Sequence, residues 1–290
     1  MRRLAIMLMF ATLAGCGSPQ RANPSLDLSL EEGRSALRAM QRTPKPLERP
    51  VLVLAGYWDP GGGVHTTAEM LRAVTSTPEM IIEVPFWSVR SWESCRDRAL
   101  DRLEQRFPSP DEARTVEVDV VGVSMGGLVA RFAAMARAES DPGRVLEINR
   151  LFTLATPHRG ARLAWIASFD NRPFDMQAGS AFLARLDAEL GARAYEVYPY
   201  VRLCDTIVGV ENTAMTGETP WWVPNPPFEA SHLNMPSDER LIADIARRLR
   251  GERPFATEPR AALPTRSRTS ENPTPARVDR RILARSGGSG

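Results

Sequence analysis

Residues 118–139 are typical of a buried strand, one sharp turn and an amphipathic helix. The strand is a run of valines, as expected where a sheet is covered on both faces, and apolar residues recur at helical spacing after the turn. Between them lies Gly122-Val123-Ser124-Met125-Gly126, a G-x-S-x-G pattern. Its glycines let the turn tighten, because a Cβ at either position would meet the neighbouring strand or helix. The pattern predicts that Ser124 stands clear of a strand end as a candidate nucleophile; an ordinary Gly-rich turn is the alternative.

The same turn also predicts where backbone N–H groups gather. The first N–H groups of the helix, led by that of Met125, are aimed at the place where a tetrahedral oxyanion would form next to Ser124. A second donor should come from the loop after the first core strand, where Tyr57 follows Gly56. We therefore expect the N–H groups of Met125 and Tyr57 to form an oxyanion hole, unless Gly56-Tyr57 is only a tight turn.

Strands and helices alternate along most of the chain. Strands are expected at residues 51–54, 80–86, 118–123, 150–155 and 197–203, and helices at 28–40, 66–74, 94–107, 124–139 and 238–249. This alternation predicts βαβ units, a mostly parallel central sheet and helices on both faces. Thr66 or Thr67 is the expected cap of the second helix, and Trp221 and Trp222 fall in an expected long loop. Ligands of such sheets bind at the carboxyl ends of the strands, where Ser124 is expected.

Residues 161–191 depart from the alternation. Two apolar helical segments, 163–169 and 180–190, follow a strand end. They are expected to form either a lid that opens against lipid above an acyl site or a cap packed permanently on the sheet.

A serine hydroxyl needs a base, most often histidine, to take its proton during attack. The chain has three histidines, His65, His158 and His232. The chain order of α/β-hydrolases is serine, then acid, then histidine, which excludes His65 and leaves little room for an acid before His158. His232, in a polar loop before the last helix, is the predicted base, although a surface-loop histidine is the alternative.

The acid that orients this histidine should end a strand between Ser124 and His232. Asp205 follows the strand at 197–203 and is the predicted acid, with Glu211 in reserve. Aspartates also occur in the apolar insertion, where an orienting carboxylate would be poorly placed.

The N-terminus is expected to lie outside the fold. Two arginines precede an apolar run at residues 4–14 that is too short to span a bilayer and suits a signal peptide. Leu13-Ala14-Gly15-Cys16 resembles the lipobox of bacterial lipoproteins, which implies that Cys16 becomes the lipidated first residue after removal of residues 1–15. Gly17 resembles the sorting signal of an outer-membrane lipoprotein. A plain secretory peptide is the alternative.

Composition limits the partners and the chain ends. The formal net charge is +2 over 290 residues, which argues against a nucleic-acid partner. Residues 16–47 are expected to be a tether with a peripheral helix, and residues 252–290, rich in Pro, Arg, Ser and Thr, a disordered tail. Cys95 and Cys204 either pair or stay as free thiols, and the oligomeric state is left open.

Four segments together resemble bacterial lipases and esterases of the α/β-hydrolase superfamily, in the branch that holds triacylglycerol lipases and PGAP1-like hydrolases. These segments are residues 51–57, 122–127, 153–160 and 231–236, and 180–186 is similar to the lid-side helix of that branch. The resemblance covers about residues 48–250. It implies an α/β-hydrolase fold over 48–251, with a small helical lid or cap at about 161–191.

One departure concerns the oxyanion loop. Ala55-Gly56 stands where related lipases commonly carry His-Gly, so the support of the loop is left open. Some relatives bind calcium near the histidine loop, but the sequence offers no convincing cluster of oxygen ligands there. We expect no metal and no cofactor.

The residues and the resemblance together predict a serine hydrolase that cleaves carboxylic esters, those of lipids above all, through an acyl-enzyme. Such a lipase or carboxylesterase would be anchored to the bacterial cell envelope through Cys16, at the outer membrane on its periplasmic or surface side. An acyltransferase or phospholipase on the same fold is the first alternative. The second is a non-catalytic envelope lipoprotein that binds lipid or a partner.

Overall fold

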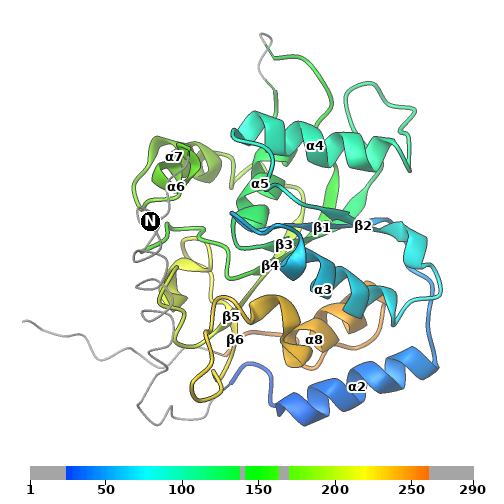
Figure 1. The fold of residues 1–290 in the computed structure, drawn as a ribbon. Helices are drawn as coiled ribbons and strands as arrows, with labels where there is room; N and C mark the ends of the chain where they lie inside the picture. The colour runs from blue at the N-terminus through cyan, green and yellow to red at the C-terminus, as the bar shows by residue number, and fades with distance from the viewer. Residues whose placement is uncertain (1–23, 138–140, 163–169, 261–290) are drawn as a thin grey trace, which may run out of the picture.

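The computed structural model describes residues 24–137, 141–162 and 170–260 (Figure 1). Six strands form one sheet in the order β2-β1-β3-β4-β5-β6, and every neighbouring pair is parallel. The strands are β1 (Val51–Leu54), β2 (Ile81–Val84), β3 (Val118–Val123), β4 (Ile148–Leu154), β5 (Glu196–Arg202) and β6 (Trp221–Val223). The predicted α/β class with a mostly parallel sheet is confirmed.

Helices cover both faces of this sheet. They are α2 (Leu30–Arg42), α3 (Gly62–Arg72), α4 (Trp92–Glu104), α5 (Met125–Ala134), α6 (Arg172–Asp175), α7 (Ala181–Ala188) and α8 (Glu239–Leu249), with short 3-10 turns η1 (Pro78–Met80), η3 (Val210–Asn212) and η4 (Met235–Ser237). Helices α4 and α5 lie on one face, α3 and α8 lie on the other, and α2 packs outside α8 (Figure 1). Because all strands run the same way, the loops after β1, β3, β4, β5 and β6 meet at one edge.

Helix α3 begins four residues earlier than the sequence predicted, and neither Thr66 nor Thr67 caps it. The carboxylate of Asp59 accepts hydrogen bonds from the N–H groups of the first turn, at 2.8 to 3.1 Å. Gly61 precedes the helix and Gly62 begins it, so the Gly-rich stretch concealed its start. The hydroxyl of Thr67 instead donates to the carbonyl of Pro236, 2.8 Å away, and joins α3 to the loop before α8.

The expected long loop around Trp221 and Trp222 contains a strand. Strand β6 pairs with β5, with Tyr200 opposite Trp221, and Trp222 is almost fully buried. Three residues are too few to show an alternating pattern, and nearby prolines favoured a loop. Packing against β5 rather than local preference makes this segment a strand.

The packed domain extends beyond the expected limits of 48 and 251. Leu26 is fully buried, and the N–H of Ser25 donates to the carbonyl of Trp222 at 2.9 Å. At the other end, the N–H of Phe255 donates to Asp244 at 2.7 Å, and the indole N–H of Trp222 donates to the carbonyl of Arg260 at 3.1 Å. Segments on either side of the hydrolase core thus meet at β6.

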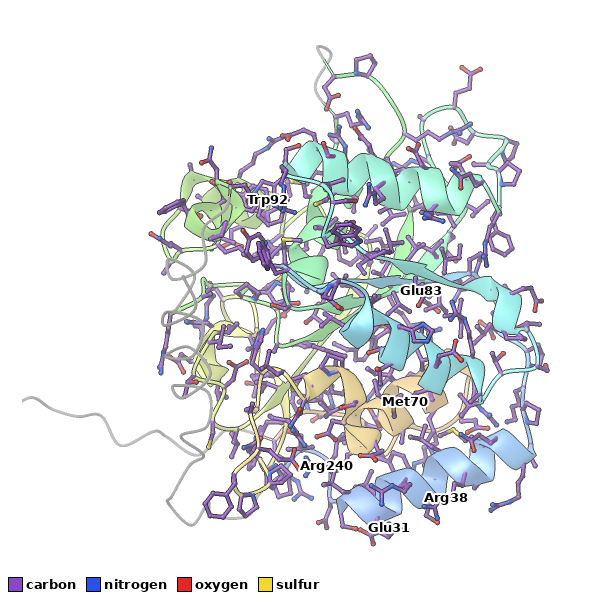
Figure 2. The ribbon with its side chains drawn as sticks, viewed as in Figure 1. Glu31, Arg38, Met70, Glu83, Trp92 and Arg240 are labelled. Atoms are coloured by element: carbon purple, nitrogen blue, oxygen red, sulfur yellow. The ribbon has the colours of Figure 1, made fainter. Side chains whose placement is uncertain are left out.

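The described part of the insertion is packed on α4 and α5. Trp92 lies at the first turn of α4 (Figure 2). Its indole donates to Asp175 at 2.9 Å and stacks on Phe182 with ring centroids 4.0 Å apart. Arg131 of α5 forms an ion pair with Asp187 at 2.9 Å. These contacts fix α6 and α7 against the domain; the helix expected at 163–169 lies outside the described residues.

Three other expectations also fall outside them: the signal peptide, lipidated Cys16 and most of the tail. The lipidation of Cys16 therefore stays a prediction. Among the helices that the structure describes, none is long and apolar enough to cross a bilayer.

The packing beyond α8 leads to a stability prediction. A chain that ends at residue 251 should unfold at a lower temperature than a chain that ends at residue 260. The shorter chain loses the half-buried Phe255 ring and the hydrogen bonds to Asp244 and Trp222, together worth about 2 kcal/mol or more. Thermal unfolding followed by circular dichroism measures the difference; equal midpoints would show that this segment adds nothing to stability.

Candidate active site

Ser124 stands at the turn between β3 and α5 with φ 50° and ψ −117°. Its N–H donates to the carbonyl of Leu154 at 2.8 Å. Its carbonyl accepts hydrogen bonds from the hydroxyl of Thr156 at 2.7 Å and from the N–H of Gly127 at 3.2 Å. A residue with a Cβ rarely keeps a positive φ unless its surroundings impose it. The end of β4 and the start of α5 impose it here.

Close packing of glycines makes this turn possible. A Cβ on Gly126 would fall on the backbone of Leu54 in β1, and a Cβ on Gly122 would fall on the backbone of Gly127 in α5. The turn is therefore pressed between β1 and α5, as expected from the sequence. Residues 156–160, Thr-Pro-His-Arg-Gly, help to hold this turn, since Thr156 fills the space beside Gly127.

The structure brings Ser124, His232 and Asp205 into one hydrogen-bonded chain. Nε2 of His232 lies 3.1 Å from Oγ of Ser124, and Nδ1 of His232 lies 2.8 Å from Oδ2 of Asp205. Asp205 follows β5 and His232 lies in the loop after β6, so three strand ends contribute one residue each. An arrangement of this kind can move the proton of the serine hydroxyl to the imidazole and stabilise the resulting positive charge.

The surroundings of Asp205 and His232 favour a negative carboxylate facing a positive imidazole. Burial opposes the charge on Asp205, but His232 and the N–H groups of Val208 and Ile207 outweigh it and lower the pKa of the carboxyl from 3.8. Burial also disfavours the charged imidazole, yet the facing carboxylate outweighs it and raises the pKa of His232 above 6.5. Oδ1 of Asp205 accepts both N–H bonds at 3.0 Å, which leaves Oδ2 for His232.

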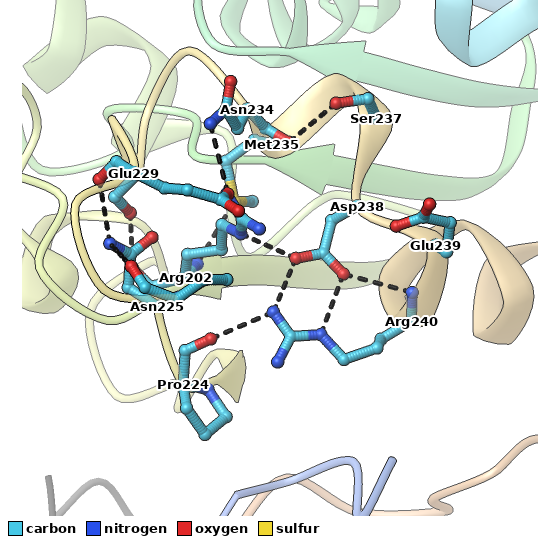
Figure 3. Close-up of polar contacts among 12 residues, drawn as sticks. Arg202, Pro224, Asn225, Glu229, Asn234, Met235, Ser237, Asp238, Glu239 and Arg240 are labelled. Atoms are coloured by element: carbon cyan, nitrogen blue, oxygen red, sulfur yellow. Dashed lines mark hydrogen bonds and ion pairs between the residues drawn. The ribbon is translucent and has the colours of Figure 1, made fainter. Parts of the chain in front are cut away.

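Buried charges hold the loops that carry the acid and the histidine, a feature that sequence reasoning missed (Figure 3). Arg202, the last residue of β5, donates to Asp238 at 2.6 Å and forms an ion pair with Glu229 at 2.8 Å. Asp238 also caps α8 and pairs with Arg240 at 2.7 Å. The sequence predicts Asp238 only as the start of a helix, because one sequence does not show which arginine reaches it. The network joins the strand before Asp205 to both sides of the His232 loop.

The other candidate residues lie elsewhere. His65 is exposed and lies 3.1 Å from Glu83. His158 is fully buried between Arg131 and Thr153, and burial, followed by the charge of Arg131, lowers the pKa of its imidazole well below 6.5. Neither ring contacts Ser124 through a hydrogen bond found in the described part of the chain.

The reserve acid, Glu211, forms an exposed ion pair with Arg162. The carboxylate of Asp205, not that of Glu211, is the one that meets His232.

The two candidate oxyanion residues flank Ser124. Met125 is the first residue of α5, so its N–H lies outside the i to i−4 ladder of the helix. A Cβ on Gly56 would lie 3.4 Å from Cβ of Ser124, so the backbone that leads into Tyr57 passes directly beside this serine. Both N–H groups therefore belong to segments next to the hydroxyl.

Backbone strain is concentrated at this edge. The non-glycine residues with positive φ in the described chain are Trp58, Ser124, Ala155, Cys204 and Phe228. Each follows a strand that ends at the same edge of the sheet. Strain of this kind persists where surrounding structure over-determines the backbone, and it clusters at functional sites.

Two further observations concern cysteine and metal. The thiol of Cys95 is free and buried, so it does not pair with Cys204, and burial raises its pKa to about 11. Within the described ranges, no group of three His, Cys, Asp or Glu side chains is arranged to hold a metal ion.

The buried charge network leads to a second prediction. Asp238→Asn should lower the free energy of unfolding by about 3 to 5 kcal/mol, because Arg202 and Arg240 lose the counter-charge that compensates their burial. Urea denaturation measures this change. Glu31→Gln is the matched control, since Glu31 pairs with arginines on the exposed side of α2 (Figure 2) and should matter little. Equal free energies of unfolding for the two variants would contradict the stabilising role of Asp238.

Comparison with known proteins gives a match over part of the chain. Residues 97–178 are similar to the PGAP1-like alpha/beta domain. The match begins inside α4, contains the Ser124 turn and ends after α6, so it covers less than half of the chain. No curated protein matches the sequence. The partial match and the parallel six-stranded sheet together support an α/β-hydrolase type of fold.

Proposed function

We propose that the protein is a serine hydrolase that cleaves carboxylic esters through an acyl-enzyme. The observation that carries the proposal is the hydrogen-bonded chain from the hydroxyl of Ser124 through His232 to the buried carboxylate of Asp205. The similarity to the PGAP1-like domain supports a hydrolase. A protein that only bound lipid would have no need of a hydrogen-bonded serine, histidine and aspartate at the edge where ligands of parallel sheets bind.

The proposed reaction follows from the geometry. His232 takes the hydroxyl proton while Oγ of Ser124 attacks the ester carbonyl, and Asp205 stabilises the imidazolium. The negative charge on the carbonyl oxygen is held by the N–H groups of Met125 and Tyr57. When the tetrahedral intermediate collapses, the C–O bond to the alcohol breaks and His232 gives its proton to that oxygen. His232 then takes a proton from water as the water attacks the acyl carbon, the bond from that carbon to Oγ of Ser124 breaks, and Oγ takes the proton back from His232 as the acid leaves.

Apolar side chains at the same edge support an acyl-chain substrate. Five large apolar residues in the described chain are at least half exposed: Trp58, Trp87, Phe174, Phe228 and Leu233. They follow β1 and β2, lie in α6, or come in the loop after β6 that carries His232, so they belong to loops at the strand ends and to the insertion. Exposed apolar groups gathered around one site typically mark the binding of an apolar ligand. We infer that the substrate is an ester with an aliphatic acyl chain, as in a lipase or carboxylesterase.

Ester hydrolysis is the first test of this function. The wild-type protein should hydrolyse p-nitrophenyl esters, and Ser124→Ala should lower kcat by at least about 10⁴-fold because the nucleophile is lost. Ser76→Ala is the matched control, since Ser76 is an exposed serine that precedes β2 at the opposite edge. Acyl chains of increasing length measure the role of the apolar rim. Activity that persists in Ser124→Ala would contradict the proposal.

The pH profile tests the acid and the base. His232 must be neutral to accept the proton, so kcat/KM should fall as pH drops through its raised pKa, above 6.5. Asp205→Asn removes the carboxylate that raises this pKa, so the acid limb should move to lower pH while kcat drops by about 10⁴-fold. Glu211→Gln should leave both unchanged. An acid limb that moves in Glu211→Gln and stays in place in Asp205→Asn would show that Asp205 is not the acid.

A further inference from the structure

Arg172 is a buried arginine that reaches from the insertion to the two candidate oxyanion residues. It is the first residue of α6, and its side chain is 3% exposed. Its Nη1 lies 3.9 Å from Sδ of Met125, and its guanidinium carbon lies 5.1 Å from the centroid of the Tyr57 ring. One guanidinium therefore contacts the side chains of both residues whose N–H groups are proposed to hold the oxyanion.

This guanidinium is itself held rigidly. Asp170 accepts hydrogen bonds from Nε at 3.0 Å and from Nη2 at 2.7 Å. Nη2 also donates to the carbonyl of Val89 at 2.8 Å, and Nη1 donates to Sγ of Cys95 at 3.2 Å. A planar fork bound on several sides is pre-organised in a way that a lysine ammonium is not. The carboxylate of Asp170 also balances the positive charge of the guanidinium. The guanidinium therefore acts through its position and its contacts more than through its electric field.

The loop that leads to Tyr57 lacks a polar side chain at the position before Gly56. Ala55 is fully buried and offers only a methyl group. The ring of Tyr57 lies against the guanidinium, and contacts between a cation and an aromatic ring are worth about 0.5 to 2 kcal/mol. Arg172 thus supports a loop whose support the sequence left open.

We propose that Arg172 is a positioning residue for the oxyanion hole, which it assembles by fixing Tyr57 and Met125 on either side of Ser124. The proposal rests on the proposed ester hydrolysis at Ser124. Because Arg172 belongs to the insertion between β4 and β5, the oxyanion hole is complete only when α6 is docked. The insertion then has a part in the chemistry itself.

The effect should appear in kcat, because the two N–H groups act on charge that develops in the transition state. Loss of one oxyanion donor costs about 10² to 10³-fold in kcat, and a displacement of about 1 Å can cost about 10²-fold. Arg172→Met should therefore lower kcat about 10 to 100-fold with little change in KM. Arg172→Lys keeps the charge without the planar fork and should restore only part of the rate.

The test uses a short, water-soluble p-nitrophenyl ester and an alkyl trifluoromethyl ketone. Oγ of Ser124 adds to the ketone carbon, its proton passes to His232, and the ketone oxygen becomes an oxyanion that reports on the hole directly. Inhibitor affinity should fall in parallel with kcat, and the acid limb of the pH profile should not move. Asp187→Asn is the matched control: it removes the ion pair between Asp187 of the insertion and Arg131 of α5, which involves neither Tyr57 nor Met125. It should keep the wild-type kcat.

Three outcomes separate the possibilities. A folded Arg172→Met protein with wild-type kcat and inhibitor affinity would overturn the role of Arg172. An equal loss of activity in Asp187→Asn would also overturn it, because any loosening of the insertion would then suffice. If the wild type is inactive, or if Ser124→Ala is active, the ester hydrolysis itself fails.

The thermal unfolding midpoint of every variant is measured first. If Arg172→Met does not fold, Arg172→Lys, Tyr57→Leu and their combination decide the question. Tyr57→Leu removes the ring that Arg172 contacts but keeps the N–H group. The losses in kcat should be less than additive in the double variant, since both changes remove one contact. Additive losses would overturn the proposal.

Discussion

The backbone of Ser124 carries a positive φ that only close contact with β1, β4 and α5 can maintain. Gly126 lies against the carbonyl of Leu54, and Thr156 holds the carbonyl of Ser124. The hydroxyl is therefore in place only after the centre of the sheet has assembled. The proposed roles of His232, Asp205 and the N–H groups of Met125 and Tyr57 all depend on where this turn places the hydroxyl, so the packing of its glycines is the constraint on the proposed site.

The remaining groups of the site are held by buried charges that meet partners. Asp205 faces His232, Asp238 joins Arg202 to Arg240, and Arg172 is balanced by Asp170, which lies two residues before it, just outside α6. A buried charge without a partner costs several kcal/mol, so the pairs Asp205–His232 and Arg202–Asp238 hold together segments that are far apart in the sequence. In this protein these segments are the loops after β5 and β6 and the start of α8.

The strongest sequence patterns predicted the centre of the fold. The valines of β3 and the glycines around Ser124 placed the turn correctly, and the alternation of strands and helices gave the parallel sheet. The start of α3 and the whole of β6 were missed, because Asp59 caps a Gly-rich segment and Trp221 is in a strand only through its pairing with β5. The same limit applies to the site. Chain order selected His232, 108 residues after Ser124, but no pattern shows which arginine meets Asp238.

The central claim is that Ser124 is a nucleophile activated by His232. Reaction of the folded protein with a fluorophosphonate, followed by intact mass and peptide mapping, tests it most directly because the reagent bonds to an activated serine without any requirement for the natural substrate. The account predicts one adduct per chain, on Ser124, formed much more slowly in His232→Ala. A folded protein that forms no adduct, or forms one at a different serine, would contradict it.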